Sequence, residues 1–377
     1  MEPRLAYIAL NQIRGVGPRT AQKLLACCPA PEHIFQLRLE ELIQVPQIGE
    51  KTAHKIYQQF SEIDPEAEIR RAAALKIKVI TQADEQYPTS LRSLYNAPLA
   101  LYVRGELREE DAQAVAVVGS RAASSYGLNT ADRLAYQMAQ RGITVVSGLA
   151  RGIDCAAHEG ALKGGGRTLA VLGGAIDEIY PPEHAELADR IVRHGALISE
   201  YPMGRSADRT TFPYRNRIIS GLSLGTLVVE SEEKGGSLHT AEAAMEQGRS
   251  VMAVPGRVDL PSSKGAHGLI KNGARLVESV EDILAEFEFE LPKLSPPKAG
   301  ADPRESLQLS PAEQTIVEAL WEESLTLDEL ARVCEVQSHQ LSMMLLGLEM
   351  KQVVTSLPGG VVELVNDVRY VNRGTHE

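Results

Sequence analysis

Between residues 114 and 256 the chain alternates short apolar runs with amphipathic stretches of helical period. The apolar runs are rich in Ala, Val, Ile and Leu, and they cover residues 114–119, 144–148, 168–174, 196–200, 226–231 and 250–256. Strands as apolar as these, with helices between them, are typical of a parallel sheet that is covered on both faces. The pattern predicts a doubly wound, mostly parallel α/β domain, to which we assign residues 66–290.

Residues 1–65 predict a series of short helices with an internal repeat. Residues 13–25 and 45–56 each contain a glycine turn, a Thr-Ala pair and a helix that carries lysine, which is the helix-hairpin-helix pattern. Free N–H groups at the start of the second helix of such a hairpin can bind a phosphate. The second copy has Gln47 where the first has Gly15, and this difference speaks against the second hairpin as a DNA contact. A purely structural helical cap is the alternative.

The carboxyl-terminal part begins with a polar segment rich in proline, residues 291–308, which we interpret as a linker. Residues 309–377 predict three helices and then two strands around the turn Pro358-Gly359-Gly360, which is the order of a winged helix. The third helix, residues 337–350, contains no Lys or Arg. Because major-groove readers use basic residues to hold phosphates and to read guanine, we expect this module to contact protein or a second copy of itself rather than duplex DNA.

Composition limits the partners of the chain. A length of 377 residues suggests two or three domains, and a net charge of −11 speaks against nonspecific wrapping of duplex DNA. Any anion site must therefore be a local cluster of cations. No apolar run is long enough to cross a membrane and the first residues lack the features of a signal peptide, so we expect a cytoplasmic protein. The 4 cysteines lack the spacing of a metal site, and we expect no metal.

Small residues follow most of the predicted strands. In an open parallel sheet, ligands bind beyond the carboxyl ends of the strands, where helix N-termini present free N–H groups. The segments at these ends are Gly119-Ser120-Arg121, Ser147-Gly148 with Arg151, Gly173-Gly174, Gly235-Gly236-Ser237 and Gly256-Arg257. We expect one edge of the sheet to gather the local cations of this acidic chain, namely Arg121, Arg151, Arg215, Arg217 and Arg257.

The segment from Phe212 to Ser223, FPYRNRIISGLS, combines an aromatic ring with two guanidinium groups and leads into a buried helix. Arginine binds phosphate through its fork of donors, and an aromatic ring offers a face on which a base can stack. This pairing favours a single-stranded nucleic acid over a small metabolite. In the alternative interpretation, Arg215 and Arg217 form ion pairs with acids such as Glu200 and Glu230.

Motifs for a dinucleotide or a nucleoside triphosphate are missing. The turn after the first strand is GSRAAS rather than GxGxxG, the second strand ends in Ser147 rather than an acid, and no GxxxxGK[ST] loop is present. We therefore expect no cofactor. Carboxylates at the strand ends could serve as a general base, hold a metal or simply orient the arginines; they are Asp154, Asp177, Glu200 and Glu230.

From about Tyr87 to Val277 a series of motifs resembles the DprA/Smf family, the DNA-processing proteins of bacterial natural transformation. The motifs include VGSRAAS, SGLARGIDCAAHEGAL, TLAVLGGAIDEIYPPEH, LISEYPMG, FPYRNRIISGLS, GGSLHTAEAAMEQGRSVMAVPG and GLIKNGA. The resemblance implies an extended Rossmann domain that binds single-stranded DNA without sequence preference, flanked by a helical N-terminal domain and a winged helix. It also implies a homodimer that loads the recombinase RecA onto incoming strands, without turnover or a cofactor.

The resemblance further implies a role for each motif residue. The implied site consists of Gly119, Ser120 and Arg121 around a backbone phosphate, Arg209 as a basic position, Phe212 under a base, Arg215, Asn216 and Arg217 in the same pocket, and Gly235, Gly236 and Ser237 at its rim. Ser147, Gly148 and Arg151, at the second strand end, complete the expected contacts. Some relatives carry a lysine where this chain has Pro182, so we expect that side of the groove to be less basic.

Two other functions are compatible with parts of the sequence. A nucleotide phosphoribohydrolase of the lysine-decarboxylase-like Rossmann family also ends its first strand in a glycine-serine turn. Its PGG-x-GT-x-x-E loop is absent here, and the nearest segment, residues 220–226, lacks the PGG and a correctly spaced acid. Alternatively, the chain is mainly an interaction scaffold in which the two flanking modules carry the essential contacts.

Overall fold

The computed structural model describes residues 1–287, 310–320, 324–334, 336–350, 353–357 and 360–364. It divides into two compact units, residues 1–295 and 296–377. The expected linker, residues 291–308, and part of the expected Pro358–Gly360 turn lie outside the described residues. In the described part of the chain, no helix combines the length and the apolar character needed to cross a membrane.

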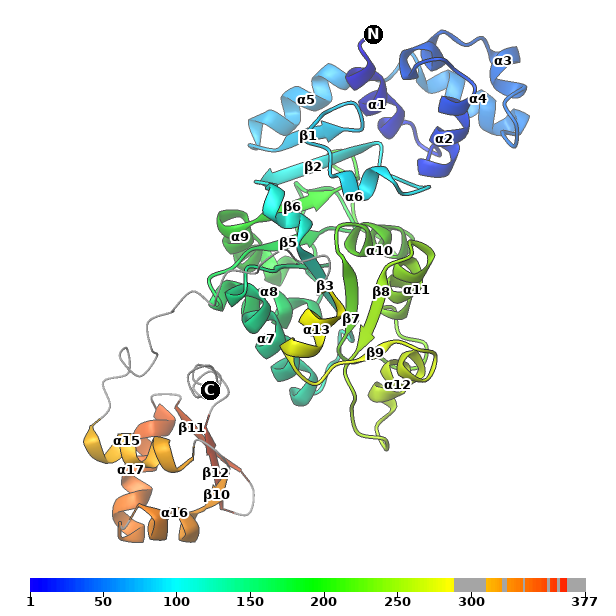
Figure 1. The fold of residues 1–377 in the computed structure, drawn as a ribbon. Helices are drawn as coiled ribbons and strands as arrows, with labels where there is room; N and C mark the ends of the chain where they lie inside the picture. The colour runs from blue at the N-terminus through cyan, green and yellow to red at the C-terminus, as the bar shows by residue number, and fades with distance from the viewer. Residues whose placement is uncertain (288–309, 321–323, 335, 351–352, 358–359, 365–377) are drawn as a thin grey trace. The chain divides into compact units, whose positions relative to one another are not determined.

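The first unit is built on a nine-stranded sheet with the order β1-β2-β6-β5-β4-β3-β7-β8-β9 (Figure 1). Its strands are β1 Lys78–Thr81, β2 Ala100–Gly105, β3 Ala114–Val118, β4 Thr144–Ser147, β5 Thr168–Val171, β6 Ala196–Ser199, β7 Gly225–Val228, β8 Ser250–Ala253 and β9 Arg275–Leu276. The strands from β6 across to β9 are parallel, whereas β1 and β2 are antiparallel additions at one edge. This confirms the predicted mostly parallel α/β sheet and adds β9 to it.

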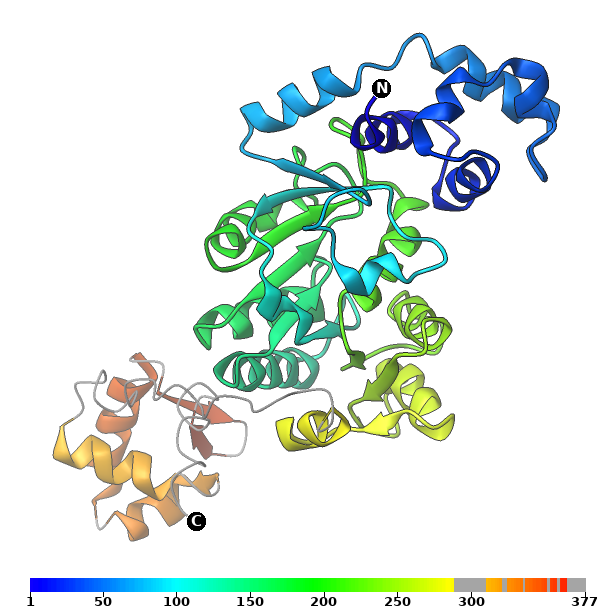
Figure 2. The same cartoon turned by 45° about the horizontal axis from the view of Figure 1, so that its top comes forward.

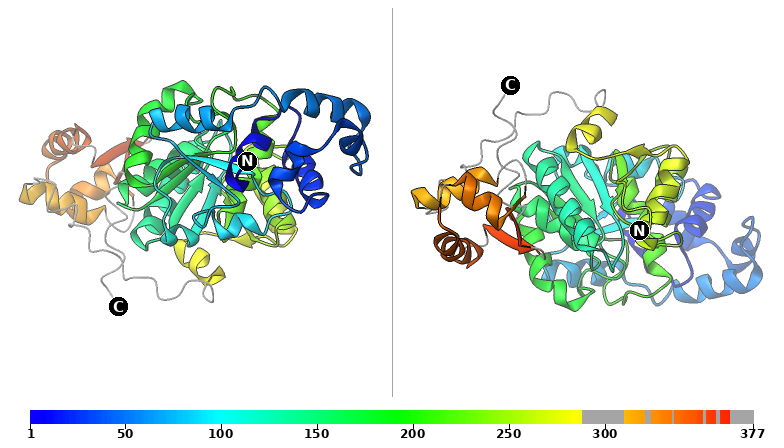
Figure 3. Two further views of the ribbon diagram at one scale, coloured as in Figure 1. Left: turned by 90° about the horizontal axis from the view of Figure 1, so that it is seen from above. Right: turned by 90° about the horizontal axis from the view of Figure 1, so that it is seen from below.

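Helices cover both faces of the sheet (Figure 3). They are α7 Ser125–Gln140, α8 Ile153–Lys163, α9 Ala185–His194, α10 Thr211–Gly221, α11 Leu238–Glu246, α12 Lys264–Lys271 and α13 Val280–Glu286, with the short α6 Thr89–Arg92. Alternate residues of β3 serve the two faces: Val115 and Val117 pack with α7 and α13, while Ala116 and Val118 pack with α10 and α11. The fully apolar strands follow from this, because each strand must supply a core on both sides.

Chain order reverses direction between β3 and β7. Strands β4, β5 and β6 follow β3 on one side, and β7 begins again on the other side of it. Such a switch point leaves a crevice beyond the carboxyl ends of the two neighbouring strands, because their connections run to opposite sides. The loops that follow β3 and β7 are held together there by a hydrogen bond of 2.7 Å from the Ser120 amide to the Glu230 carbonyl.

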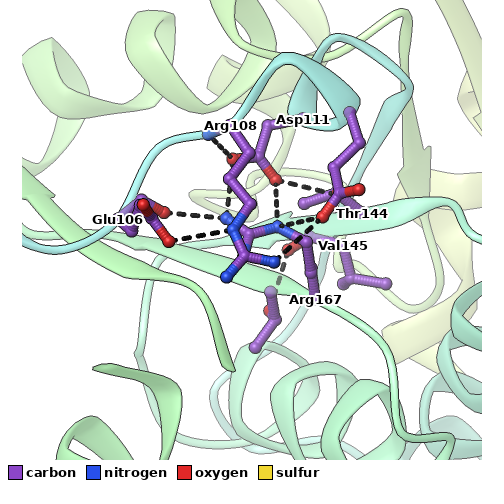
Figure 4. A network of polar contacts seen from close by, with 8 residues as sticks. Glu106, Arg108, Asp111, Thr144, Val145 and Arg167 are labelled. Atoms are coloured by element: carbon purple, nitrogen blue, oxygen red, sulfur yellow. Dashed lines mark hydrogen bonds and ion pairs between the residues drawn. The ribbon is translucent and has the colours of Figure 1, made fainter. Parts of the chain in front are cut away.

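At the opposite, amino-terminal edge, a partly buried ion pair joins the strands (Figure 4). Arg167 donates from Nε and Nη2 to the two carboxylate oxygens of Asp111, both at 2.8 Å, and Nη2 also donates to the Glu106 carbonyl at 2.7 Å. The Thr144 hydroxyl donates to the same carboxylate at 3.0 Å. A bidentate pair with further donors satisfies both charges, so this edge is stabilised independently of the crevice.

The N-terminal helices gather beyond the β1 edge (Figure 2). They are α1 Pro3–Gln12, α2 Pro18–Ala26, η1 Pro31–Gln36, α3 Leu39–Ile43, α4 Glu50–Gln59 and α5 Pro65–Ala74, and α1 to α4 have a core of their own. Both predicted hairpins form, with α2 and α4 as second helices. Gln47 adopts a φ of 62°, in the same left-handed region as Gly15 at 92°, so the second turn keeps its shape without glycine. The predicted boundary between residues 65 and 66 stays a prediction.

In its described residues, the second unit contains three helices and a small sheet. The helices are α15 Pro311–Ala319, α16 Leu327–Val333 and α17 Ser338–Met350, and the strands are β10 Leu325–Thr326, β11 Val354–Leu357 and β12 Val361–Leu364. The strand order β10-β12-β11 places the β11–β12 hairpin beside β10. Ser310 and Thr326 form capping boxes at the starts of α15 and α16. This arrangement confirms the winged helix.

Candidate nucleic-acid interface

A cavity of about 480 Å³ lies beyond the carboxyl ends of β3 and β7. Its walls are the loop after β3, the first turns of α10, and the loop that leads from β7 into α11. Most of the predicted contact residues line it: Gly119, Ser120, Arg121, Arg209, Phe212, Arg215, Asn216, Gly235, Gly236 and Ser237. We call this space the strand-end cavity.

An arginine and a phenylalanine from different segments meet in the strand-end cavity. The guanidinium carbon of Arg121 lies 4.9 Å from the centre of the Phe212 ring, within the range of a cation–π contact. The exposed Tyr180 ring lies 5.8 Å from Phe212, tilted by 42°. Phe212 rests against Gly173, where a β-carbon would lie 2.6 Å from the ring atom Cδ1. Gly173 is therefore needed for the position of the ring.

Two of the cations at the cavity have no acidic partner in the described part of the chain. Arg151 and Arg257, which were expected at the same edge, lie outside the cavity and form ion pairs with Glu183 and Asp259. By contrast, Arg121 and Arg209 are exposed and have no ion-pair partner among the residues that the structure describes. Their charge is therefore available to an anion that enters the cavity.

Arg215 contributes its charge from beneath the cavity wall. It is 4% exposed, and its Nη1 donates to the carbonyl of Gly148 at 2.7 Å and to that of Val171. Burial lowers the pKa of Arg215 to about 10, a shift that nearby Asp154 opposes, so the side chain remains cationic at neutral pH. Gly148 is a glycine for this reason: a β-carbon there would lie 2.5 Å from the guanidinium group.

Helical periodicity explains why Arg217 lies elsewhere. Because α10 begins at Thr211, Phe212 and Arg215 are three residues apart on one face, whereas Arg217 is five residues from Phe212 and points away. Arg217 is 5% exposed and forms a buried ion pair with Glu200. For this arginine the structure shows the ion-paired alternative, and it lines a neighbouring cavity instead.

Three further predicted contacts also lie outside the strand-end cavity. Ser147 is the last residue of a central strand, and its buried hydroxyl donates to the Val117 carbonyl at 2.6 Å. Gly148 is buried beneath the Arg215 guanidinium, and Arg151 is exposed but paired with Glu183. The structure thus gives Ser147 and Gly148 packing roles, and it does not bring these residues to the cavity surface.

The acidic residues at the strand ends are occupied by other groups. Asp154 accepts from the amides of Gly148 and Ala150 at 3.1 and 3.3 Å, and burial raises its pKa. Glu230 accepts 2.6 Å from the Ser124 hydroxyl and 3.1 Å from the Ser124 amide at the start of α7. Asp177 pairs with Arg71 at 3.0 Å. These carboxylates therefore position backbone and arginines, in agreement with the orienting alternative.

Sequence reasoning did not select some residues that line the cavity or contact the residues lining it. Tyr180 contacts Phe212, and His239, Thr240, Ser231 and Glu232 line the α11 side. Tyr180 could have been found from its place in the loop after the third predicted strand, since that loop meets the same edge of the sheet. Glu232 carries no such signal, because its position in the β7–α11 loop depends on tertiary structure.

Family models match all three parts of the chain. Residues 78–288 match the model of DNA recombination-mediator protein A, residues 299–360 match the DprA winged helix domain, and residues 7–62 match a SAM-like helix-hairpin-helix tandem. Protein Smf of Synechocystis sp. is 32% identical over 384 residues, which cover 94% of this chain and 96% of the relative. Protein Smf of Escherichia coli is 40% identical, covering 76% and 77%.

Two solved structures of related sequence resemble the fold. The crystal structure of DNA processing protein A from Streptococcus pneumoniae has a TM-score of 0.66 and 36% identity, covering 76% of this chain and 99% of that one. DNA processing protein A from Helicobacter pylori has a TM-score of 0.52 and 26% identity, covering 57% and 98%, and its structure was described for a single-stranded DNA binding mode. The chain belongs to the DprA/Smf family of DNA recombination-mediator proteins.

Proposed function

We propose that this protein binds single-stranded DNA without sequence preference in the strand-end cavity and acts as a recombination mediator that loads RecA onto incoming strands in natural transformation. One observation carries the proposal: Arg121 and Phe212 form a preassembled pair of cation and ring, 4.9 Å apart, beside the exposed Arg209. A planar base can stack on the same face of the ring by taking the place of the guanidinium, which then pairs with a phosphate.

The chemistry of the cavity supports single strands over duplex. Stacking on Phe212 requires an unstacked base, which a single strand offers and a duplex does not. The arginines bind phosphate groups, which are the same in every nucleotide. The ring can stack on the flat face of any base, so neither contact selects a sequence. Gly235 and Gly236 carry no side chains, which lets a sugar-phosphate backbone come close to the rim.

We further propose that the protein works as a cytoplasmic homodimer and performs no turnover. The hydrolase alternative would use a strand-end carboxylate as its base. Glu230, one of the strand-end acids that could serve as this base, is engaged by both the hydroxyl and the amide of Ser124. Incubation with AMP, with release of adenine as the readout, separates the two functions: release that the Glu230→Gln variant abolishes would favour the enzyme.

The proposal is tested by titrating the protein with single strands and with duplexes of the same mixed sequence. We expect tight binding of the single strand, weak binding of the duplex, and similar affinities for single strands of different sequence. The double variant Arg121→Ala/Arg209→Ala should lose the single strand, while Arg257→Ala, whose arginine is exposed and paired outside the cavity, should not. Equal affinity for duplex and single strand would contradict the proposed mode of binding.

RecA loading needs its own measurement. The rate at which RecA hydrolyses ATP on a protein-coated single strand reports how fast RecA assembles on it. Wild-type protein should shorten the lag before hydrolysis, and the Arg121→Ala/Arg209→Ala variant should not. If the wild type binds the strand tightly and leaves the lag unchanged, strand binding stands and the mediator role fails.

A further inference from the structure

A second, larger cavity of about 880 Å³ adjoins the first. One side is the first helical hairpin, from Gly15 to Lys23, and the other is the start of α10 with Tyr214 and Arg217. Pro213 and His239 line both cavities, so the two spaces meet at these residues. We call this space the hairpin cavity.

Helix α10 has one face in each cavity. Phe212, Arg215 and Asn216 line the strand-end cavity, whereas Tyr214 and Arg217, which are three residues apart, line the hairpin cavity. Tyr214 is 57% exposed, so its ring is accessible to a base, and the helix holds its backbone in place. A strand that leaves Phe212 along α10 therefore reaches a second aromatic ring.

The hairpin presents uncapped donors and cations to this space. Helix α2 begins at Pro18, which has no N–H, and no side chain caps it, so the amides of Arg19 and Thr20 have no partner within the helix. No atom lies within 4 Å of the β-carbon positions of Gly15 and Gly17, which leaves the turn open. Arg19 and Lys23 extend the positive charge by one further turn.

An independent observation at the opposite wall also points to an anionic or acceptor-rich ligand. Arg217 is 5% exposed and lines the hairpin cavity, yet only its Nη2 is engaged, with the Glu200 carboxylate. Its Nε and Nη1 are buried without a hydrogen-bond partner in the described structure. Buried guanidinium N–H groups are normally satisfied, so an arginine that lines this cavity still has two donors without a partner among the described residues.

The hairpin is fixed in place relative to α10. The Asn11 side chain at the end of α1 donates to the Glu200 carbonyl at 2.9 Å, and α1 also packs against β1 and β2. The acids Glu242 and Glu246 lie on the α11 side of the cavity. An entering strand would therefore turn its phosphates to the hairpin and its bases, whose amino groups can donate to carboxylates, to α11.

We propose that the hairpin cavity is a second subsite for the same single strand, in which Arg19, Lys23 and the start of α2 hold phosphates and Tyr214 supports a base. This inference rests on the proposed function and extends it, because it assigns the N-terminal hairpin to the DNA path. It also predicts that one protein molecule binds a longer stretch of single strand than the strand-end cavity alone can hold.

The test uses the full-length protein and single strands of graded length. In the wild type, affinity should rise with length until a strand spans both cavities. Arg19→Ala/Lys23→Ala should bind the shortest strands like the wild type but bind long strands about tenfold or more weakly. Its salt slope on long strands should be smaller by about 1.4, or about 0.7 for each phosphate that is no longer neutralised.

The internal repeat supplies a matched control. Lys51 and Lys55 stand at the equivalent positions of the second hairpin, are exposed, and do not line the cavity. Lys51→Ala/Lys55→Ala removes the same charge and should bind all lengths like the wild type. If both double variants lose the same affinity, or if neither loses any, the second subsite is wrong.

A further comparison separates this inference from the proposed function. Arg121→Ala should weaken short and long strands alike, because it acts in the strand-end cavity. If the affinity of the wild type does not depend on strand length, the proposed function stands but the hairpin subsite is wrong. A wild type that binds no single strand overturns both.

Discussion

The guanidinium group of Arg121 covers the ring of Phe212, although the two residues lie far apart in the sequence and on different elements. Arg121 follows β3, and Phe212 lies in the first turn of α10, which precedes β7. The contact holds the ring and the charge in register before any ligand is present. A preassembled site of this kind binds with a smaller loss of side-chain entropy.

The first prediction concerns the charge of Arg121. Arg121→Ala should weaken binding of a single strand about tenfold or more, since a charge-assisted hydrogen bond contributes about 1.5–3 kcal/mol. The slope of log affinity against log salt should fall by about 0.7, because one phosphate fewer is neutralised. Fluorescence anisotropy over a range of salt concentrations measures both. Arg121→Lys keeps the charge but loses the paired donors of the guanidinium group, so its affinity should lie between those of the wild type and the alanine variant. An unchanged salt slope in a folded alanine variant would contradict the assignment.

The second prediction concerns the seat of the Phe212 ring. Gly173→Ala places a β-carbon 2.6 Å from the ring and should displace it, with a loss of affinity on the order of 1–3 kcal/mol, similar to that of Phe212→Ala. Gly268→Ala is the control, because it adds the same methyl group outside both cavities, at a position where no atom lies within 4 Å. Strand titrations of the three variants measure the effect. Combining Gly173→Ala with Phe212→Ala should add little, and full additivity would show that Gly173 acts on something other than the ring.

The third prediction separates structural from binding arginines. Glu200→Gln leaves the buried Arg217 charge without its partner and should reduce the free energy of unfolding by about 3–5 kcal/mol. Replacing both residues together, with Glu200→Leu and Arg217→Met, should restore much of that loss. Urea denaturation measures these differences. Asp259→Asn, in the exposed pair with Arg257, should change stability little, and a stable Glu200→Gln protein would argue against a structural role for the pair.

The fourth prediction concerns acid stability through His158. Thr168 gives its only hydroxyl proton to the Val145 carbonyl, so it accepts from Nδ1 of His158 at 2.7 Å, and the buried Nε2 has no partner among the described residues. Burial lowers the pKa of His158 to about 3, from an ordinary value of about 6.5, and the charges of His184 and Arg215 act in the same direction.

The unfolded chain therefore binds a proton below pH 6.5 that the folded protein does not bind until about pH 3. This contribution to stability is complete above pH 6.5 and decreases as the pH falls, by about 2 kcal/mol at pH 5. His158→Asn keeps a donor toward Thr168 and cannot titrate, so its stability should depend less on pH over this range. Parallel curves for the two proteins in urea denaturation from pH 7 to pH 5 would refute the prediction.

Hydrophobic pattern was enough to predict the central fold. Six buried parallel strands and the winged helix could be located because the buried strands are short apolar runs and the helices show helical period. Strand β9 could not be found in this way, since its two residues are exposed and pair only with β8. The predicted strands also ran too far at their carboxyl ends, where small residues leave the ladder and enter the loops of the cavity.

The sequence predicted those site residues whose position follows from lying in a loop at a strand end. It predicted less well those whose position depends on the direction in which a side chain points from a helix. The glycines and Arg121 lie at strand ends, and the position of strand ends follows from the pattern. Arg215 and Arg217 are two residues apart in one motif, yet one lines the strand-end cavity and the other lines the hairpin cavity. That difference depends on where α10 begins, which the sequence pattern did not determine.

Arg215 has a consequence for how the protein behaves at high ionic strength. Dissolved ions screen the exposed charges of Arg121 and Arg209, but they have little access to a guanidinium that is 4% exposed beneath the wall. The electrostatic attraction of Arg215 for a phosphate in the cavity therefore remains when salt has screened the attraction of Arg121 and Arg209. Together with stacking on Phe212, this gives the protein a salt-resistant part of its affinity, so a strand that is slow to arrive in concentrated salt can still be retained once it has entered.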